Sequence, residues 1–222
     1  MLKRFSLTVF MMSATMPAFA QAPKAEVGVV VGWVFSDGVY TSNTYVVPGV
    51  GTFNRVDPKD SFGWGFDVGF MVGPHEEVGF QYTQQPTKLQ AGGTTTVDIG
   101  DLSTHTYHGT FTYNFGPNDG AVRPYFLIGL GGTSYGDVNY TRANGATGTI
   151  SGLSRFSSTW GAGVKVYGAG HVGGRLGIRW TPTYIKSDSA GWWCDPFWGC
   201  YVVGNSQYSN QFDLNGGITV RF

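Results

Sequence analysis

Three polar residues in the middle of the chain have the types and spacing of a hydrolytic site. Asp101, Ser103 and His105 follow one another at every second position. A serine hydroxyl attacks an acyl carbon when a histidine accepts its proton and a carboxylate orients that histidine. Closeness in sequence does not supply the mutual geometry that such a site requires. The hydrolytic site is therefore the minor alternative, and the sequence predicts that the chain is not an enzyme.

The chain has two cysteines, Cys194 and Cys200. In an oxidising compartment we expect them to form a disulfide, and closing so short a ring contributes roughly 2.4 kcal/mol in the chain-entropy model. The surrounding stretch is either a stapled loop tip or an exposed aromatic knob that contacts a partner surface, a glycan or lipid headgroups. The knob would consist of Trp192, Trp193, Phe197, Trp198 and Tyr201.

Other reactive groups are sparse, and we expect no metal site and no cofactor. His105 and His108 are three positions apart in a segment with strand periodicity, so their side chains should leave opposite faces. No histidine lies near the two cysteines, which argues against zinc.

Charged residues are sorted onto one side of the alternating segments. Taking every second position places eight of them on a common face: Glu26, Asp67, Glu77, Lys165, Arg175, Arg179, Asp213 and Arg221. The opposite positions are apolar, as in 212–222, where Phe212, Leu214, Ile218 and Val220 alternate with polar residues. If the polar face lines a narrow barrel, these charges must be paired and hydrogen-bonded. The sequence therefore predicts a lumenal network of ion pairs.

Period-two alternation recurs eight times along the chain, which is typical of strands. The segments are 26–35, 61–72, 77–84, 105–115, 124–135, 157–167, 172–186 and 209–222. Three connections, 73–76, 116–120 and 168–171, are short and rich in turn-forming residues. The other four, 36–60, 85–104, 136–156 and 187–208, are long.

This alternation of short and long connections is typical of outer-membrane barrels, which have short periplasmic turns and longer extracellular loops. Only 13% of the residues are charged, 16% are aromatic and 35 are glycine, against about 25% charged in ordinary soluble domains. We therefore predict an all-β fold, a transmembrane antiparallel up-and-down barrel of eight strands with four long extracellular loops. A soluble barrel with an apolar interior is the alternative, but it leaves the terminal Phe222 and the alternation of short and long connections without an explanation.

The first twenty residues have the order of a secretory signal peptide. Lys3 and Arg4 precede a mostly apolar stretch, and Ala18-Phe19-Ala20 is a small-x-small cleavage site. We expect residues 1–20 to be removed and residues 21–222 to form the barrel domain. The remaining chain would carry twelve basic against fourteen acidic residues, which gives no reason to expect nucleic acid as a partner.

Taken together, the signal peptide, the eight alternating segments, the Gly73-Pro74 and Gly116-Pro117 turns and the closing segment 217–222 resemble the small outer-membrane β-barrel family of the OmpA/OmpX type. The resemblance implies residence in the outer membrane, with its lipid and lipopolysaccharide as neighbours. It also implies that Phe222 serves as the signal that the barrel-assembly machinery reads. No cofactor is implied.

Two functions remain open from the sequence. One is a structural or surface-interaction barrel, whose lumen is filled by charges and whose loops meet an extracellular ligand. The other is a narrow porin-like channel for small solutes, which is supported by the many glycines on the polar face. An eight-stranded barrel is only just wide enough for its side chains to fill, so the sequence favours the first.

Overall fold

We describe the fold from a computed structural model of the chain. The described residues are 24–47, 51–117, 119–141, 145–168, 170–185, 194–195, 199–200 and 207–222. The predicted signal peptide lies outside them. In this part of the chain no helix is long and apolar enough to cross a membrane.

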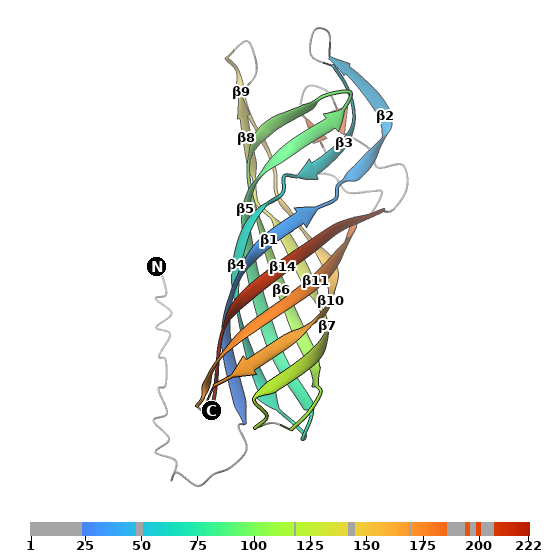
Figure 1. The fold of residues 1–222 in the computed structure, drawn as a ribbon. Helices are drawn as coiled ribbons and strands as arrows, with labels where there is room; N and C mark the ends of the chain where they lie inside the picture. Colours follow the sequence, from blue (N-terminus) through green and yellow to red (C-terminus); the bar gives the residue numbers. More distant parts are fainter. Residues whose placement is uncertain are drawn as a thin grey trace, which may run out of the picture.

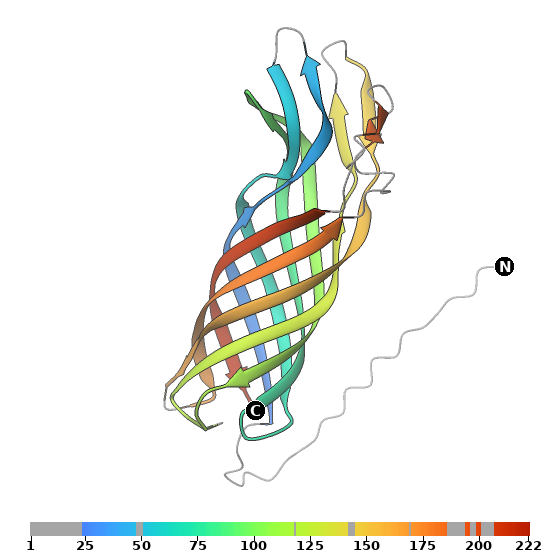
Figure 2. The same ribbon diagram turned by 90° about the vertical axis from the view of Figure 1, so that its right-hand side faces the viewer.

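Eight long strands form a closed antiparallel barrel, as the alternation predicts (Figures 1 and 2). They are β1 (Ala25–Ser36), β4 (Ser61–Met71), β5 (Glu76–Gly93), β6 (Thr96–Asn114), β7 (Val122–Tyr135), β10 (Leu153–Tyr167), β11 (Val172–Ile185) and β14 (Gln207–Arg221). Each pairs with the next, and β14 closes the barrel against β1, with Glu26 opposite Arg221 and Ser36 opposite Gln211. Closure leaves no free edge among these strands, so their backbone groups find partners within the sheet.

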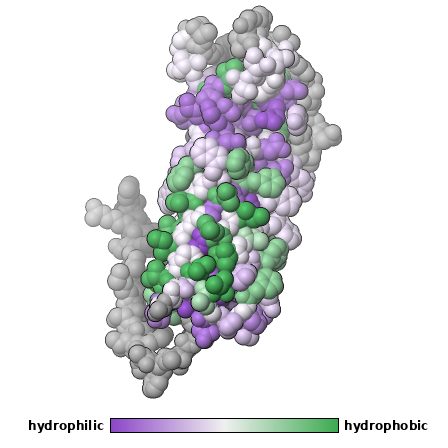
Figure 3. Space-filling model, viewed as in Figure 1, coloured by the Kyte–Doolittle hydropathy of each residue, from purple (hydrophilic) through white to green (hydrophobic). Residues whose placement is uncertain are grey.

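The two faces of the wall divide as expected. On β1, Val29 points outward and is 56% exposed, whereas Glu26 is 1% exposed and points into the lumen. The outward face carries exposed Val, Ile, Leu, Phe and Trp side chains on every barrel strand. Figure 3 shows hydrophobic residues gathered on the lower part of the face in view, with hydrophilic residues above them. An apolar band outside and a polar interior fit a lipid environment, not a soluble barrel.

Aromatic side chains mark the two borders of the band. Toward the end with the long connections, called the loop end below, Trp160, Trp180, Phe212 and Phe35 stand in register across four strands. The rings of Trp180 and Phe212 stack with centroids 6.1 Å apart. Toward the turn end, exposed aromatic residues include Tyr113, Phe115 and Phe222. Such girdles lie at the two membrane interfaces.

The long connections contain strands of their own, and one prediction about them is wrong. Residues 85–104 are not a loop, because β5 and β6 run on to Gly93 and Thr96 as one long hairpin. Its outward residues above the apolar band are polar, among them Lys88 and Asp101, which hides the alternation. The remaining connections carry β2 (Val39–Val47), β3 (Gly51–Pro58), β8 (Val138–Thr141), β9 (Thr147–Ile150), β12 (Cys194–Asp195) and β13 (Gly199–Cys200).

Glycines allow the wall to curve tightly. A Cβ atom on Gly131 would lie 1.8 Å from the carbonyl oxygen of Tyr107, and one on Gly65 would lie 2.2 Å from that of Tyr82. Both positions face the lumen, where neighbouring backbones approach most closely. Larger residues there would force the strands apart, so part of the glycine content serves closure of a narrow barrel.

Arginine substitutions on the outward face test how deeply each position lies in the membrane. Leu176→Arg places a charge midway between the girdles, and Val172→Arg places one on the same face of β11 at the turn end; the wild-type residues are 66% and 59% exposed. We expect the first to lower the free energy of unfolding in lipid vesicles by about 2–4 kcal/mol and the second by about 0–1 kcal/mol, because hydrocarbon cannot solvate the guanidinium. Equal effects in a urea titration would contradict the membrane-spanning orientation.

Candidate functional site

The turn end of the lumen is crossed by a chain of four buried charges. Arg123 Nη1 donates to Glu26 Oε1 at 2.5 Å, and Lys165 Nζ donates to the other oxygen of Glu26 and to Glu77 Oε2, the latter at 2.8 Å. All four side chains are buried, and Arg123 is 0% exposed. The two carboxylates balance the two cations, which satisfies the requirement that buried charges be paired.

Two further ion pairs lie deeper toward the loop end. Arg175 Nη1 donates to Asp67, and its Nη2 donates to the phenol oxygen of Tyr125 at 3.2 Å. Above them, Arg179 Nε donates to Asp213 Oδ2 at 2.6 Å. The guanidinium groups therefore reach carboxylates across or along the lumen, as the sorting of charges predicts.

Arg221 contacts backbone carbonyls at the turn end of the inward face. It donates to the carbonyl oxygens of Gly120 and Gly170 at 3.2 and 3.4 Å, and its guanidinium lies 4.1 Å from the ring centroid of Tyr167. Gly120 and Gly170 belong to two of the short connections. This side chain therefore ties the turns together beneath the lumen, where the carbonyls of the connections need donors.

Arg123 is the member of the network that sequence reasoning missed. The predicted strand begins at Pro124, two residues after the observed start, so Arg123 is assigned to no face. In the structure β7 begins at Val122 and Arg123 stands opposite Lys165. Extending the alternation of Tyr125 and Leu127 back by one step would have placed it on the lumenal face.

Hydroxyl groups fill the lumen above the charges. Ser157 Oγ is hydrogen-bonded to His108 Nε2 and accepts from Thr133 Oγ1, and Thr183 Oγ1 donates to Thr133; each distance is 2.9 Å. Short β-branched residues pack efficiently on a concave surface while their hydroxyls satisfy one another. This layer is polar but carries no net charge.

Little free space remains between these layers. The cavity near Arg179 and Asp213 measures about 30 Å³, and the one beside Lys165 and Arg175 about 10 Å³. One water molecule needs roughly 10–15 Å³ by this measure. The first therefore holds one or two waters and the second about one at most, so neither of these two cavities accommodates a larger solute.

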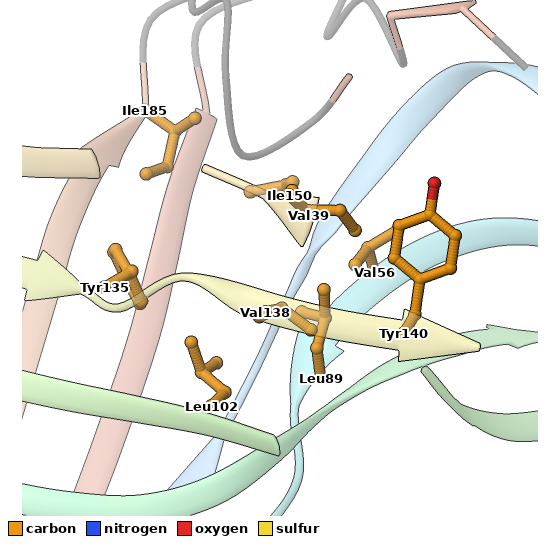
Figure 4. Packing of buried hydrophobic residues seen from close by; sticks show 9 residues of the cluster. All are labelled: Val39, Val56, Leu89, Leu102, Tyr135, Val138, Tyr140, Ile150 and Ile185. Carbon is orange, nitrogen blue, oxygen red and sulfur yellow. The ribbon is translucent and has the colours of Figure 1, made fainter. Parts of the chain in front are cut away.

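An apolar cluster closes the loop end of the lumen (Figure 4). It consists of Val39, Val56, Leu89, Leu102, Tyr135, Val138, Tyr140, Ile150 and Ile185, all nearly or fully buried. These residues come from eight strands, including the hairpins β2–β3 and β8–β9. The sequence reading placed most of them in loops and missed this second core. It lies beyond the girdle, so the hairpins stand outside the apolar band as a packed unit.

A bidentate ion pair links two residues of β3 near this cluster. Arg55 Nε and Nη2 donate to the two oxygens of Asp57 at 3.1 Å each. Burial raises the pKa of Asp57, and the hydrogen bonds from Arg55 work against that rise. A bidentate geometry fixes orientation as well as charge, so the pair fixes these two side chains relative to each other on one face of β3.

The cysteine stretch is described only in part. Cys194 and Cys200 stand opposite each other in the short β12–β13 ladder. Their side chains, and the knob residues Trp192, Trp193, Phe197, Trp198 and Tyr201, lie outside the described residues. The disulfide and the knob therefore stay predictions.

The network makes a prediction about stability. Arg123→Met leaves Glu26 and Glu77 with only Lys165 between them, so we expect the free energy of unfolding to fall by about 3–5 kcal/mol. Adding Glu26→Gln restores the charge balance and should recover part of the loss. Lys59→Ala is the control, because this exposed cation should be worth no more than about 1 kcal/mol. Additive losses in the double variant, measured by urea unfolding, would contradict the coupling.

Comparisons with known proteins agree with this geometry. A family model described as the outer membrane protein β-barrel domain matches residues 6–222. No curated protein matches. Among solved structures, the outer membrane protein OprG from Pseudomonas aeruginosa aligns at 12% identity over 90% of this chain and 96% of that one, with a TM-score of 0.62.

Two further solved structures have the same fold. Neisserial surface protein A aligns at 13% identity over 89% of this chain and 97% of its own, with a TM-score of 0.53. The outer membrane protein AlkL, solved in DMPC lipid bilayers, aligns at 14% identity over 95% and 97%, also with a TM-score of 0.53. At these identities the likeness concerns the fold alone.

Proposed function

The chain belongs to the outer membrane protein β-barrel domain family, and from this premise we propose that it is a structural barrel of the outer membrane with a sealed lumen. Its interactions with the exterior would then be carried by the loop-end hairpins. Family membership supports the location. The sealed lumen and the surface role go further and rest on the geometry described above.

The observation that carries the proposal is the charged layer of Glu26, Arg123, Lys165 and Glu77. Arg123 pairs with Glu26 at 2.5 Å and Lys165 pairs with Glu77 at 2.8 Å, and all four side chains are nearly excluded from solvent. Moving an ion past them would require breaking pairs in a low-dielectric environment, which costs several kcal/mol. The apolar cluster at the loop end adds a second barrier.

The alternative is a narrow porin-like channel. Lumenal glycines such as Gly65 support it in the sequence, because small side chains leave room. Against it, a Cβ atom on Gly65 would meet backbone and not open space, so that glycine serves close strand packing. The cavities of about 30 and 10 Å³ are also too small for a solute other than water.

The partners proposed for this chain follow from its two ends. Outer-membrane phospholipid and lipopolysaccharide would surround the apolar band, and the barrel-assembly machinery would read Phe222 during insertion. Removal of residues 1–20 would deliver residues 21–222 to the periplasm. An extracellular ligand would meet the hairpins and the knob that follows β11.

Single-channel recording tests the sealed lumen. The protein without residues 1–20 is refolded, checked by heat-modifiable gel mobility and added to planar bilayers. We expect no discrete steps from the folded protein, while a known porin added to the same bilayers gives them. Reproducible steps from the folded protein would overturn the proposal in favour of the channel.

The proposed disulfide has its own test. In the folded protein we expect Cys194 and Cys200 to resist labelling by a maleimide until a reductant is added, because both thiols would be consumed by the bond. Mass spectrometry of the labelled protein gives the number of cysteines that have reacted. A Cys194→Ser variant should expose one thiol without reductant. Labelling of both cysteines in the unreduced wild type would contradict the bond.

A further inference from the structure

Four polar side chains form a closed ring of hydrogen bonds on the outward face of β5 and β6. Ser103 Oγ lies 3.0 Å from His105 Nε2, and His105 Nδ1 lies 2.8 Å from the phenol oxygen of Tyr82. Gln84 completes the ring: its Oε1 accepts from Tyr82 at 3.4 Å, and its Nε2 donates to Ser103 Oγ at 3.4 Å. All four side chains are partly exposed on the outside of the barrel.

The donor directions in this ring are consistent around the whole circuit. Gln84 Nε2 can only donate, so Ser103 Oγ accepts from it and has its own proton free for His105 Nε2. Tyr82 donates its proton to Gln84 Oε1, so its oxygen accepts from His105 Nδ1–H. The ring thus accommodates the neutral imidazole with its proton on Nδ1, in which Nε2 accepts from Ser103 and can act as a base.

We propose that Ser103, His105, Tyr82 and Gln84 form an acyl-transfer site that cleaves acyl esters of outer-leaflet lipids. Ser103 is the nucleophile, His105 is the general base and Tyr82 is the positioning residue for the imidazole. The Gln84 amide, which already points at Ser103 Oγ, is the donor for the oxyanion. This goes beyond the structural role proposed above and does not depend on whether the lumen conducts.

The sequence candidate Asp101 is not part of the ring. It is exposed and stands opposite Lys88 in the β5–β6 ladder. Tyr82 from the neighbouring strand takes the orienting position that a carboxylate would have filled. Strand pairing, which the sequence did not supply, brings this phenol to the histidine, and the expectation of no enzymatic activity was made without it.

The depth of the ring matches that of lipid ester groups. His105 lies nine residues above Asn114, the turn end of β6, and the girdle residue Phe212 lies nine residues above Arg221, the turn end of β14. The site is therefore level with the loop-end girdle, which marks the boundary between hydrocarbon and headgroups.

The residues around the site change from apolar below it to charged above it, as the boundary between hydrocarbon and headgroups does. Below it, the rings of Trp64, Phe66 and Tyr107 lie 5.1–6.0 Å from that of Tyr82 and form an apolar platform for an acyl chain. Above it, charged residues begin at Lys88 and Asp101. An ester bound with its chain on the platform would place its carbonyl carbon near Ser103.

The chemistry balances without a further reactant other than water. Ser103 Oγ bonds to the acyl carbon as its proton passes to His105 Nε2, and Gln84 Nε2 donates to the resulting oxyanion. The ester C–O bond then breaks, and His105 returns the proton to the departing alcohol oxygen. Water, deprotonated by His105, hydrolyses the acyl-serine to a carboxylic acid and restores the hydroxyl.

A second serine on the same surface supplies a matched control. Residues 132–136 have the Gly-x-Ser-x-Gly pattern of a nucleophile elbow, which the sequence reading overlooked. Here the pattern runs through the end of strand β7 and not into a helix. Its Ser134 stands opposite His105 in the ladder and accepts from Ser154 Oγ at 2.9 Å, whereas the serine oxygen within hydrogen-bond distance of His105 Nε2 is that of Ser103.

The test uses the folded protein in vesicles, with release of fatty acid measured by mass spectrometry. One set of vesicles contains phosphatidylglycerol and phosphatidylethanolamine, and the other contains lipopolysaccharide as well. Release confined to the second set identifies lipopolysaccharide acyl esters as the substrate, and release from the first identifies phospholipid. Either result supports an acyl-ester site, and no release from either set overturns it.

Variants assign the roles. We expect Ser103→Ala and His105→Asn each to lower the rate about 100-fold or more, and Ser134→Ala to leave it unchanged. Tyr82→Phe keeps the aromatic platform, so kcat should fall about 10-fold with KM unchanged. A fluorophosphonate should label the wild type and Ser134→Ala but not Ser103→Ala. With heat-modifiable mobility confirming folding, activity or labelling that survives Ser103→Ala would overturn the assignment.

Discussion

Closure of the wall between β1 and β14 is the constraint on which the rest of the structure depends. Hydrocarbon offers no partners to backbone N–H and C=O groups, so a β-structure spans it only when no strand edge is left free. With eight strands the closed wall is narrow, and the side chains that point inward must fill it. The charged residues on that face are therefore buried, and burial requires the pairing of Glu26 with Arg123 and Lys165.

The same closure separates three environments along the molecule. Charges and turns occupy the turn end, hydroxyl groups fill the layer above, and an apolar cluster packs inside the loop-end hairpins. The outer surface has the opposite order of polarity. It is apolar between the girdles, where the lumen is polar, and it is polar beyond them, where the interior is apolar. The ring of Ser103, His105, Tyr82 and Gln84 lies at this outer boundary. It is built on rigid paired strands, which is where precise geometry is most easily held.

Much of this could be predicted from the sequence. Alternation at every second residue placed all eight named charges in buried or paired positions on the inward face, because a strand has only two faces. It missed Arg123 because the predicted strand begins two residues after the observed start at Val122. The same alternation assigned 85–104 to a loop. Above the membrane both faces of a strand can be polar or mixed, and the alternation is then lost. The Tyr82–His105 contact joins different strands, and a single sequence does not give the register that brings them together.

Access of a small reagent to the lumen tests the central claim, a sealed interior, most directly. Ser157 is 0% exposed and lies in the hydroxyl layer, so Ser157→Cys, in a background with Cys194→Ser and Cys200→Ser, places one thiol inside the barrel. The folded protein in lipid vesicles is treated with a charged methanethiosulfonate. We expect no labelling until the protein is unfolded. Rapid labelling of the folded protein would show an open water path and contradict it.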